Sequence, residues 1–143
     1  MKSVNSFVIC PATPEEAGLI DNKIDEFINS WVPFTQEHPP ILKNYVIKEN
    51  GAIIAGINAD IYYWGILFID VLFVDENHRD KGLGCALLQK VESEARAMGS
   101  KLAHLHTFDL QAKDFYLKQG YEIFGVLEDC PPGHRGYYLK KTL

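Results

Sequence analysis

The feature that most constrains the fold is the stretch of residues 66–74, which is apolar on both faces except for Asp70. Such a run is typical of a central strand that other elements cover on both sides. A polar turn containing Gly82 and Gly84 follows. Beyond it, apolar residues recur at helical spacing, at Leu83, Leu87, Leu88, Val91 and Ala95. A buried strand, a tight turn and an amphipathic helix in this order predict an α/β domain.

The flanking sequence predicts the other elements of the same domain. A helix begins at Pro14, after Thr13 as N-cap and with acidic residues in its first turn. A loop is expected at residues 31–40, a turn at Asn50-Gly51 and a helix over residues 111–119, and helices are expected to end at Gly99 and Gly120. Strands are expected at residues 6–10, 42–48, 52–63, 102–107, 121–127 and 137–140, and the last of these closes the sheet. We therefore expect residues 1–143 to form one domain.

Composition and charge exclude several classes of protein. The 143 residues include 14 Lys and Arg against 19 Asp and Glu, a formal net charge of -5. An acidic chain lacks the basic footprint of a nucleic-acid-binding protein, so we expect no nucleic acid partner. Its three cysteines, at positions 10, 85 and 130, form no CxxC motif, so neither a disulfide framework nor a cysteine zinc site is indicated. The apolar runs fall far short of the ~20 residues of a membrane helix. A cytoplasmic protein with no membrane contact is expected.

The turn after the buried strand has the properties of a phosphate-binding site. It reads Arg79-x-x-Gly82-x-Gly84, and the free amides of a helix's first turn attract anions. A dinucleotide fingerprint is excluded because Leu87 stands where the third glycine belongs. A P-loop is excluded because no Gly-Lys-Ser or Gly-Lys-Thr occurs. Two interpretations stay open here, namely a phosphate site and glycines that only pack the helix against the sheet.

A second block resolves this choice through resemblance to a known family. It reads Ala112-x-x-Phe115-Tyr116-x-x-x-Gly120-Tyr121, and it follows the run Leu72-Phe73-Val74-Asp75 and the glycine turn. Over residues 66–125 the chain resembles the GNAT superfamily of acetyl-CoA-dependent N-acetyltransferases. The resemblance implies an α/β GNAT fold, with a central mixed, mostly antiparallel sheet and helices on both faces.

The same resemblance implies a binding site for acetyl-CoA as co-substrate, without a metal. The first-turn segment would hold the diphosphate through Asp80, Lys81, Gly82, Leu83, Gly84 and Cys85, with charge added by Arg79 and Lys81. Backbone groups of the Leu72, Phe73 and Val74 segment would pair with the pantetheine arm, Phe115 would line that arm, and Lys118 would reach the adenosine phosphate. Asp109 is a further candidate for cofactor binding, at a position where many members carry Asn. An ionised aspartate cannot donate the hydrogen bond that the amide group of Asn donates.

Two residues are expected to act in catalysis. In the resemblance, Tyr116 faces the thioester sulfur, whereas a core aromatic is the structural alternative. Asp70 is the only charge in its strand and is expected to share a face with Leu72 and Val74. It is a candidate base or amine anchor, with a purely structural carboxylate as the alternative. We expect transfer of an acetyl group to a primary amine by direct attack.

The acceptor itself is not identified by the sequence. Acidic residues Asp60, Asp70 and Asp109 favour a cationic amine, either a small molecule or a peptide. GNAT relatives imply a possible homodimer. Other functions left open are a non-catalytic CoA-binding module and a phosphate-ligand-binding module. His104-x-His106 is interpreted as a pair of ordinary strand histidines, because no third metal ligand stands at a suitable spacing.

Overall fold

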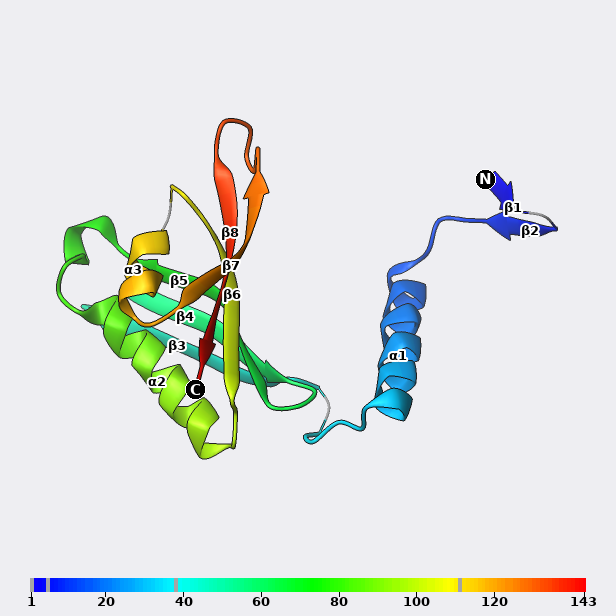
Figure 1. The fold of residues 1–143 in the computed structure, drawn as a ribbon, viewed down its shortest axis with the longest axis horizontal. Coiled ribbons are helices and arrows are strands. Elements are labelled where there is room, and N and C mark those ends of the chain that lie inside the picture. The colour runs from blue at the N-terminus through cyan, green and yellow to red at the C-terminus, as the bar shows by residue number, and fades with distance from the viewer. Residues whose placement is uncertain (1, 5, 38, 111) are drawn as a thin grey trace. The chain divides into compact units, whose positions relative to one another are not determined.

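The computed structural model describes residues 2–4, 6–37, 39–110 and 112–143, and the chain divides into two compact units, residues 1–34 and 35–143. The first unit holds β1 (Lys2–Val4), β2 (Phe7–Ile9) and α1 (Pro14–Trp31). Figure 1 shows these elements in blue. Strands β1 and β2 pair with each other in a two-stranded antiparallel sheet. The predicted first strand therefore belongs to a separate small sheet.

Helix α1 begins where its sequence predicts. Thr13 accepts a hydrogen bond from the backbone N–H of Glu16 at 3.1 Å, and the Glu16 carboxylate accepts one from the Thr13 N–H at 3.0 Å. This reciprocal capping box satisfies two donors that the first helical turn leaves free. None of the described helices has the length and apolarity needed to cross a membrane.

The second unit is built on a six-stranded mixed sheet, as expected for the α/β class. Its strands are β3 (Ile41–Glu49), β4 (Ala52–Tyr62), β5 (Ile66–Val74), β6 (Leu102–Phe108), β7 (Glu122–Glu128) and β8 (Arg135–Thr142). They lie in the order β3-β4-β5-β6-β8-β7, and only β5 and β6 are parallel. The β3–β4 hairpin turns at Asn50 and Gly51, both with positive φ, as the sequence predicts.

Strand β8 corrects one expectation. It does not close the sheet but lies between β6 and β7, pairing antiparallel with both. The chain passes through α3 (Lys113–Lys118) after β6, forms β7 beyond the neighbouring position, and folds back so that β8 fills the gap. Local patterns cannot distinguish this order from a simple succession of strands.

Helix α2 (Leu83–Ala97) carries the predicted apolar stripe into the core. Leu87, Leu88, Val91 and Ala95 are buried among apolar residues of β4, β5, β6 and β8. A short 3-10 helix, η1 (Glu76–His78), precedes α2 and was not anticipated. Helix α3 is shorter than the predicted 111–119, and Gln111 lies outside the described residues. Helices α2 and α3 both contribute to one core cluster. The expectation that helices cover both faces of the sheet stays a prediction.

Candidate active site

A cleft of about 720 Å³ opens beside the C-terminal half of β5 and the first turn of α2. Ten of the residues assigned to cofactor binding line it: Leu72, Phe73, Val74, Arg79, Asp80, Gly82, Leu83, Gly84, Cys85 and Phe115. Three further lining residues, His78, Leu110 and Ala112, were not assigned a role by the sequence. The structure thus brings together both sequence blocks, which lie about thirty residues apart.

The cleft exists because β5 and β6 separate. Their parallel register runs from Leu67–Ala103 to Ile69–Leu105, whereas β5 continues to Val74. On its other side β5 stays paired with β4 as far as Val74. The β6-facing edge of Leu72–Val74 is thereby available to an extended ligand, in the manner of β-strand addition.

The first turn of α2 faces the same cleft. Gly82 occupies the N-cap position with φ +79°, in the left-handed region that glycine enters without steric penalty. No side chain caps this helix end. The first-turn amides have no partner within the helix, and such amides attract anions. Binding of a diphosphate here stays a prediction.

The aromatic ring of Phe115 lines the same cleft as Leu72, Phe73 and Val74 of β5. A Cβ atom built on Gly84 would lie 3.5 Å from the ring of Phe115 and 3.5 Å from a methyl group of Val74. The backbone of α2 is therefore held closely between α3 and β5. Cys85, at the same helix end, directs its thiol toward the side-chain oxygen of Gln119 at 3.4 Å.

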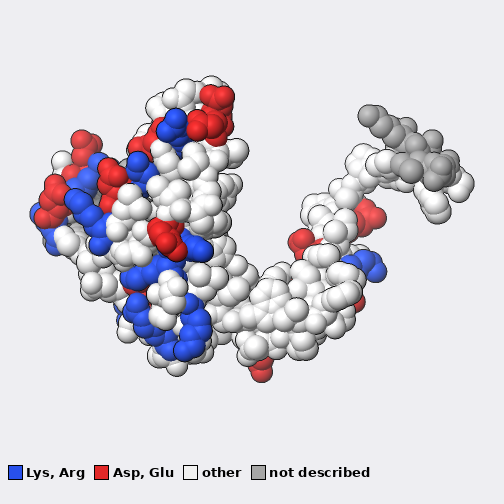
Figure 2. All heavy atoms as spheres, in the orientation of Figure 1, with Lys and Arg blue, Asp and Glu red and all other residues white. Residues whose placement is uncertain are grey.

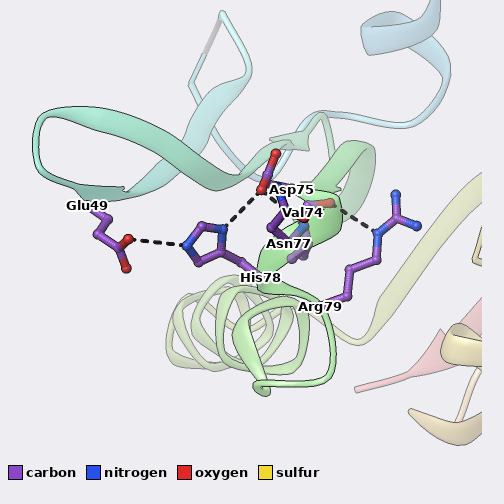
Figure 3. A network of polar contacts seen from close by, with 6 residues as sticks. All are labelled: Glu49, Val74, Asp75, Asn77, His78 and Arg79. Atoms are coloured by element: carbon purple, nitrogen blue, oxygen red, sulfur yellow. Dashed lines mark hydrogen bonds and ion pairs between the residues drawn. The ribbon is translucent and has the colours of Figure 1, made fainter.

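A polar network fixes the segment between β5 and α2 (Figure 3). The two ring nitrogens of His78 lie 3.0 Å from an Asp75 carboxylate oxygen and 3.3 Å from a Glu49 carboxylate oxygen. Arg79 donates from Nε to the carbonyl oxygen of Val74 at 3.4 Å. The Arg79 guanidinium therefore stands at the cleft on a segment that is tied to β5 and β3. Sequence reasoning missed His78, although the spacing Asp75-x-x-His78 places an acid and a histidine one turn apart.

Tyr116 lies next to the cleft wall rather than in the lining. Its side chain is only 5% exposed, and it packs edge-on against Phe115 at 5.3 Å and Tyr121 at 5.6 Å between ring centroids. Burial raises the pKa of the Tyr116 phenol to about 12. The phenol is therefore neutral at physiological pH and can donate a hydrogen bond. Its contact with the sulfur stays a prediction.

The surroundings of Asp70 correct another expectation. The β4–β5 register shifts between Asn58–Val71 and Ala59–Ile69, so Asp70 lies in a β-bulge. Leu72 and Val74 consequently lie on the same covered face of the sheet as Leu67 and Ile69. Asp70 is the extra residue of the bulge, is exposed, and does not lie on that face with Leu72 and Val74 as the alternation predicts. A period-two pattern cannot register the extra residue of a bulge.

Asp60, on the neighbouring strand, interacts with Asp70. Burial, together with the charge of Asp70, raises the pKa of the Asp60 carboxyl. Across the sheet, Tyr62 and His104 lie 2.6 Å apart between the phenol oxygen and Nε2. Two carboxylates and a histidine thus lie on the neighbouring strands β4, β5 and β6.

Three of the predicted cofactor residues, Lys81, Asp109 and Lys118, are not among the described residues that line the cleft. Their contacts with the cofactor stay predictions. The Asp109 carboxylate lies 3.0 Å from Nδ1 of His134 and accepts a hydrogen bond from the Arg135 N–H at 3.1 Å. Asp109 thereby ties the end of β6 to the β7–β8 turn and lines a separate cavity of about 350 Å³.

The two histidines of β6 pack against aromatic side chains, and Nε2 of His106 is buried with no hydrogen-bond partner among the described residues. His104 contacts Tyr62 and Phe68, and His106 packs against Phe108 and Tyr138. No group of three or more possible metal ligands is found in the described part of the chain.

Charge on the second unit is mixed in sign. Figure 2 shows Lys and Arg side chains interspersed with Asp and Glu on its visible face. This face therefore carries no broad positive field.

Comparison with known proteins identifies the same family that the two sequence blocks resemble. The sequence model of the "Acetyltransferase (GNAT) family" matches residues 11–121. The blasticidin-S acetyltransferase of Streptomyces morookaense is 33% identical over 104 residues, which cover 72% of this chain and 76% of that protein. Homology thus spans both sequence blocks of the cleft.

Solved structures resemble the chain over most of its length. The crystal structure of an acetyltransferase from Bacillus cereus is 35% identical with a TM-score of 0.86, covering 95% of this chain and 97% of that one. An acetyltransferase structure from Bacillus anthracis, solved in complex with acetyl coenzyme A, is 20% identical with a TM-score of 0.64. It covers 74% of this chain and 65% of that one, and supports the fold alone.

Proposed function

The chain belongs to the acetyltransferase (GNAT) family and is an acyltransferase, and we propose that it transfers the acetyl group of acetyl-CoA to a primary amine. The observation that carries the proposal is the cleft itself. It combines first-turn amides that no side chain caps with the edge of β5 that β6 leaves unpaired. Residues of both family blocks line it.

The described residues fit acetyl-CoA as a substrate. The amides of Leu83, Gly84 and Cys85 would bind the diphosphate, and Arg79 would add a positive charge. The edge of Leu72–Val74 would pair with the amides of the pantetheine arm, against Phe115. A cleft of about 720 Å³ lies within the usual range of small-molecule sites, ~300–1,000 Å³.

The reaction proposed is direct attack by the amine nitrogen on the thioester carbonyl carbon. A C–N bond forms and the C–S bond breaks. The amine nitrogen loses one proton, and the departing thiolate takes up one proton to leave as a thiol. A backbone amide near Leu72 would stabilise the developing oxyanion. Tyr116 would donate a hydrogen bond to the departing sulfur.

The acceptor proposed is a cationic amine. An amine with a pKa of about 10.4 is protonated at pH 7, and deprotonating it costs about 4.6 kcal/mol. Asp70 is the proposed base or anchor, because it lies at the bulge directly before the cleft-lining part of β5 and beside Asp60. The blasticidin-S acetyltransferase relative makes blasticidin S a suitable first acceptor to test.

We further propose that residues 1–143 act as one acetyltransferase domain, since the family match at residues 11–121 spans both units. The three free cysteines are consistent with a reducing compartment, for which we propose the cytoplasm.

The test is a thiol-release assay with acetyl-CoA and a panel of amines: blasticidin S, an aminoglycoside, a polyamine and a peptide with a free N-terminus. Mass spectrometry of the product should show one added acetyl group on nitrogen. Acetyl-CoA should bind at tens of micromolar or tighter. Absence of acetyl-CoA binding at that concentration would refute the proposal.

A further inference from the structure

The histidine beside the predicted phosphate site bridges two carboxylates. His78 Nδ1 lies 3.0 Å from Oδ2 of Asp75, and Nε2 lies 3.3 Å from Oε1 of Glu49 (Figure 3). Asp75 directly follows β5, whereas Glu49 is the last residue of β3. The imidazole therefore joins the start of the cleft segment, residues 75–82, to the β3–β4 hairpin.

Both contacts can be hydrogen bonds only when the ring carries two protons. A neutral imidazole has one N–H, so its second nitrogen would present a lone pair to a carboxylate. In the imidazolium form both nitrogens donate to negatively charged acceptors, which are the stronger class of hydrogen bond. Hydrogen bonds to Asp75 and Glu49 raise the pKa of His78, and burial and the charge of Lys81 oppose them.

The bridge acts on the wall of the cleft. Asp75 is itself fixed, because its N–H donates to the carbonyl oxygen of Ile54 at 2.7 Å and its carboxylate accepts from the Asn77 N–H at 3.2 Å. His78 lines the cleft and immediately precedes Arg79. Releasing one arm of the bridge would loosen the segment that presents Arg79 and leads into Gly82.

We propose that His78, as an imidazolium held by Asp75 and Glu49, is a positioning residue that holds the diphosphate-binding segment in its binding conformation. The inference rests on the proposed function, since acetyl-CoA is the ligand whose diphosphate it serves. His78 acts through the segment and through its positive charge at the cleft, and it takes no part in acetyl transfer.

The proposal has a thermodynamic consequence with a definite sign. A diphosphate arriving beside His78 stabilises the imidazolium, so the bound form has the higher histidine pKa and binding takes up a proton. Affinity is therefore fully present below the free-state pKa of His78 and is lost as pH rises through the bound-state pKa. If binding raises that pKa by one unit, affinity falls about tenfold across the transition.

The test compares acetyl-CoA affinity from pH 6 to 8.5 in the wild-type protein and in His78→Gln, by isothermal titration calorimetry. The ratio of the two dissociation constants removes the titration of the ligand's own phosphate, which is common to both. We expect a wild-type advantage of about tenfold at low pH that disappears at high pH. A second readout is proton uptake, taken from binding enthalpies in two buffers of different ionisation enthalpy, which His78→Gln should abolish.

The matched control is His134→Gln, which removes another histidine that faces a carboxylate but lies away from the cleft. It should keep the wild-type pH profile. Should His78→Gln fail to fold, Glu49→Gln carries the test, since removing one carboxylate should move the wild-type midpoint to lower pH. A ratio that is constant with pH, or a midpoint unmoved by Glu49→Gln, overturns the inference. If the wild-type protein binds no acetyl-CoA at any pH, the proposed function itself has failed.

Discussion

Replacement of Tyr116 by Phe tests how the leaving thiolate is stabilised. Burial raises the pKa of this phenol to about 12, whereas an ordinary thiol has a pKa of about 8.5. Full transfer of the phenolic proton to the thiolate is therefore uphill by about 5 kcal/mol. A hydrogen bond to the charged sulfur is the contribution that remains, and such bonds are worth about 1.5–3 kcal/mol.

The expected loss in kcat is therefore about 10- to 150-fold. Steady-state thiol release at saturating acetyl-CoA measures it, and the affinity for acetyl-CoA should change little because the aromatic ring is retained. The kcat profile should show no limb from Tyr116 between pH 7 and 10, since its pKa lies near 12. Tyr138→Phe, which changes a partly exposed tyrosine of β8 away from the cleft, is the control.

Two results would refute this reasoning. A Tyr116→Phe enzyme with wild-type kcat would remove the phenol from the site. A loss above a thousandfold, with a wild-type pH limb near 8 or 9 that the variant lacks, would instead show a true proton donor whose pKa is much lower than burial implies.

Three further changes test other parts of the molecule. Gly82→Ala places a side chain at φ +79° and should destabilise the protein by about 1–2 kcal/mol in urea unfolding, with weaker acetyl-CoA binding; Gly84→Ala, which meets only ordinary contacts, is the control and should fold normally. Asp70→Asn should lower the rate at pH 7 and recover as pH approaches the amine pKa, and a deficit that is equal at every pH would indicate a structural role. Glu94, whose pKa is lowered to about 2 by hydrogen bonds from Tyr45, Lys43 and Lys90, contributes stability that is present above the unfolded-state value of 4.5 and lost as pH falls toward 2. Glu94→Gln should flatten this acid limb in thermal melts, and an unchanged pH dependence would contradict the assignment.

Much of the site follows from local sequence patterns. The apolar run of β5, the stripe of α2 and the glycine turn between them were each predicted, because strand and helix periodicity and the freedom of glycine act within a few neighbouring residues. Resemblance to the family then assigned ten residues that the structure collects in one cleft. Tyr116 and Asp70 keep their predicted roles as proposals.

Other features depend on contacts between distant segments. Three features depend on which strands pair and in which register. They are the insertion of β8 between β6 and β7, the bulge at Asp70 and the Asp109–His134 contact. His78 meets Glu49 across 29 residues of sequence, so local spacing can indicate its contact with Asp75 but not its second carboxylate. The sequence by itself determined most of the segments that become strands and helices, and it placed the glycine turn at the start of α2. Only tertiary packing decided which charged side chains face one another, because these pairings depend on strand register and not on the chain's own periodicity.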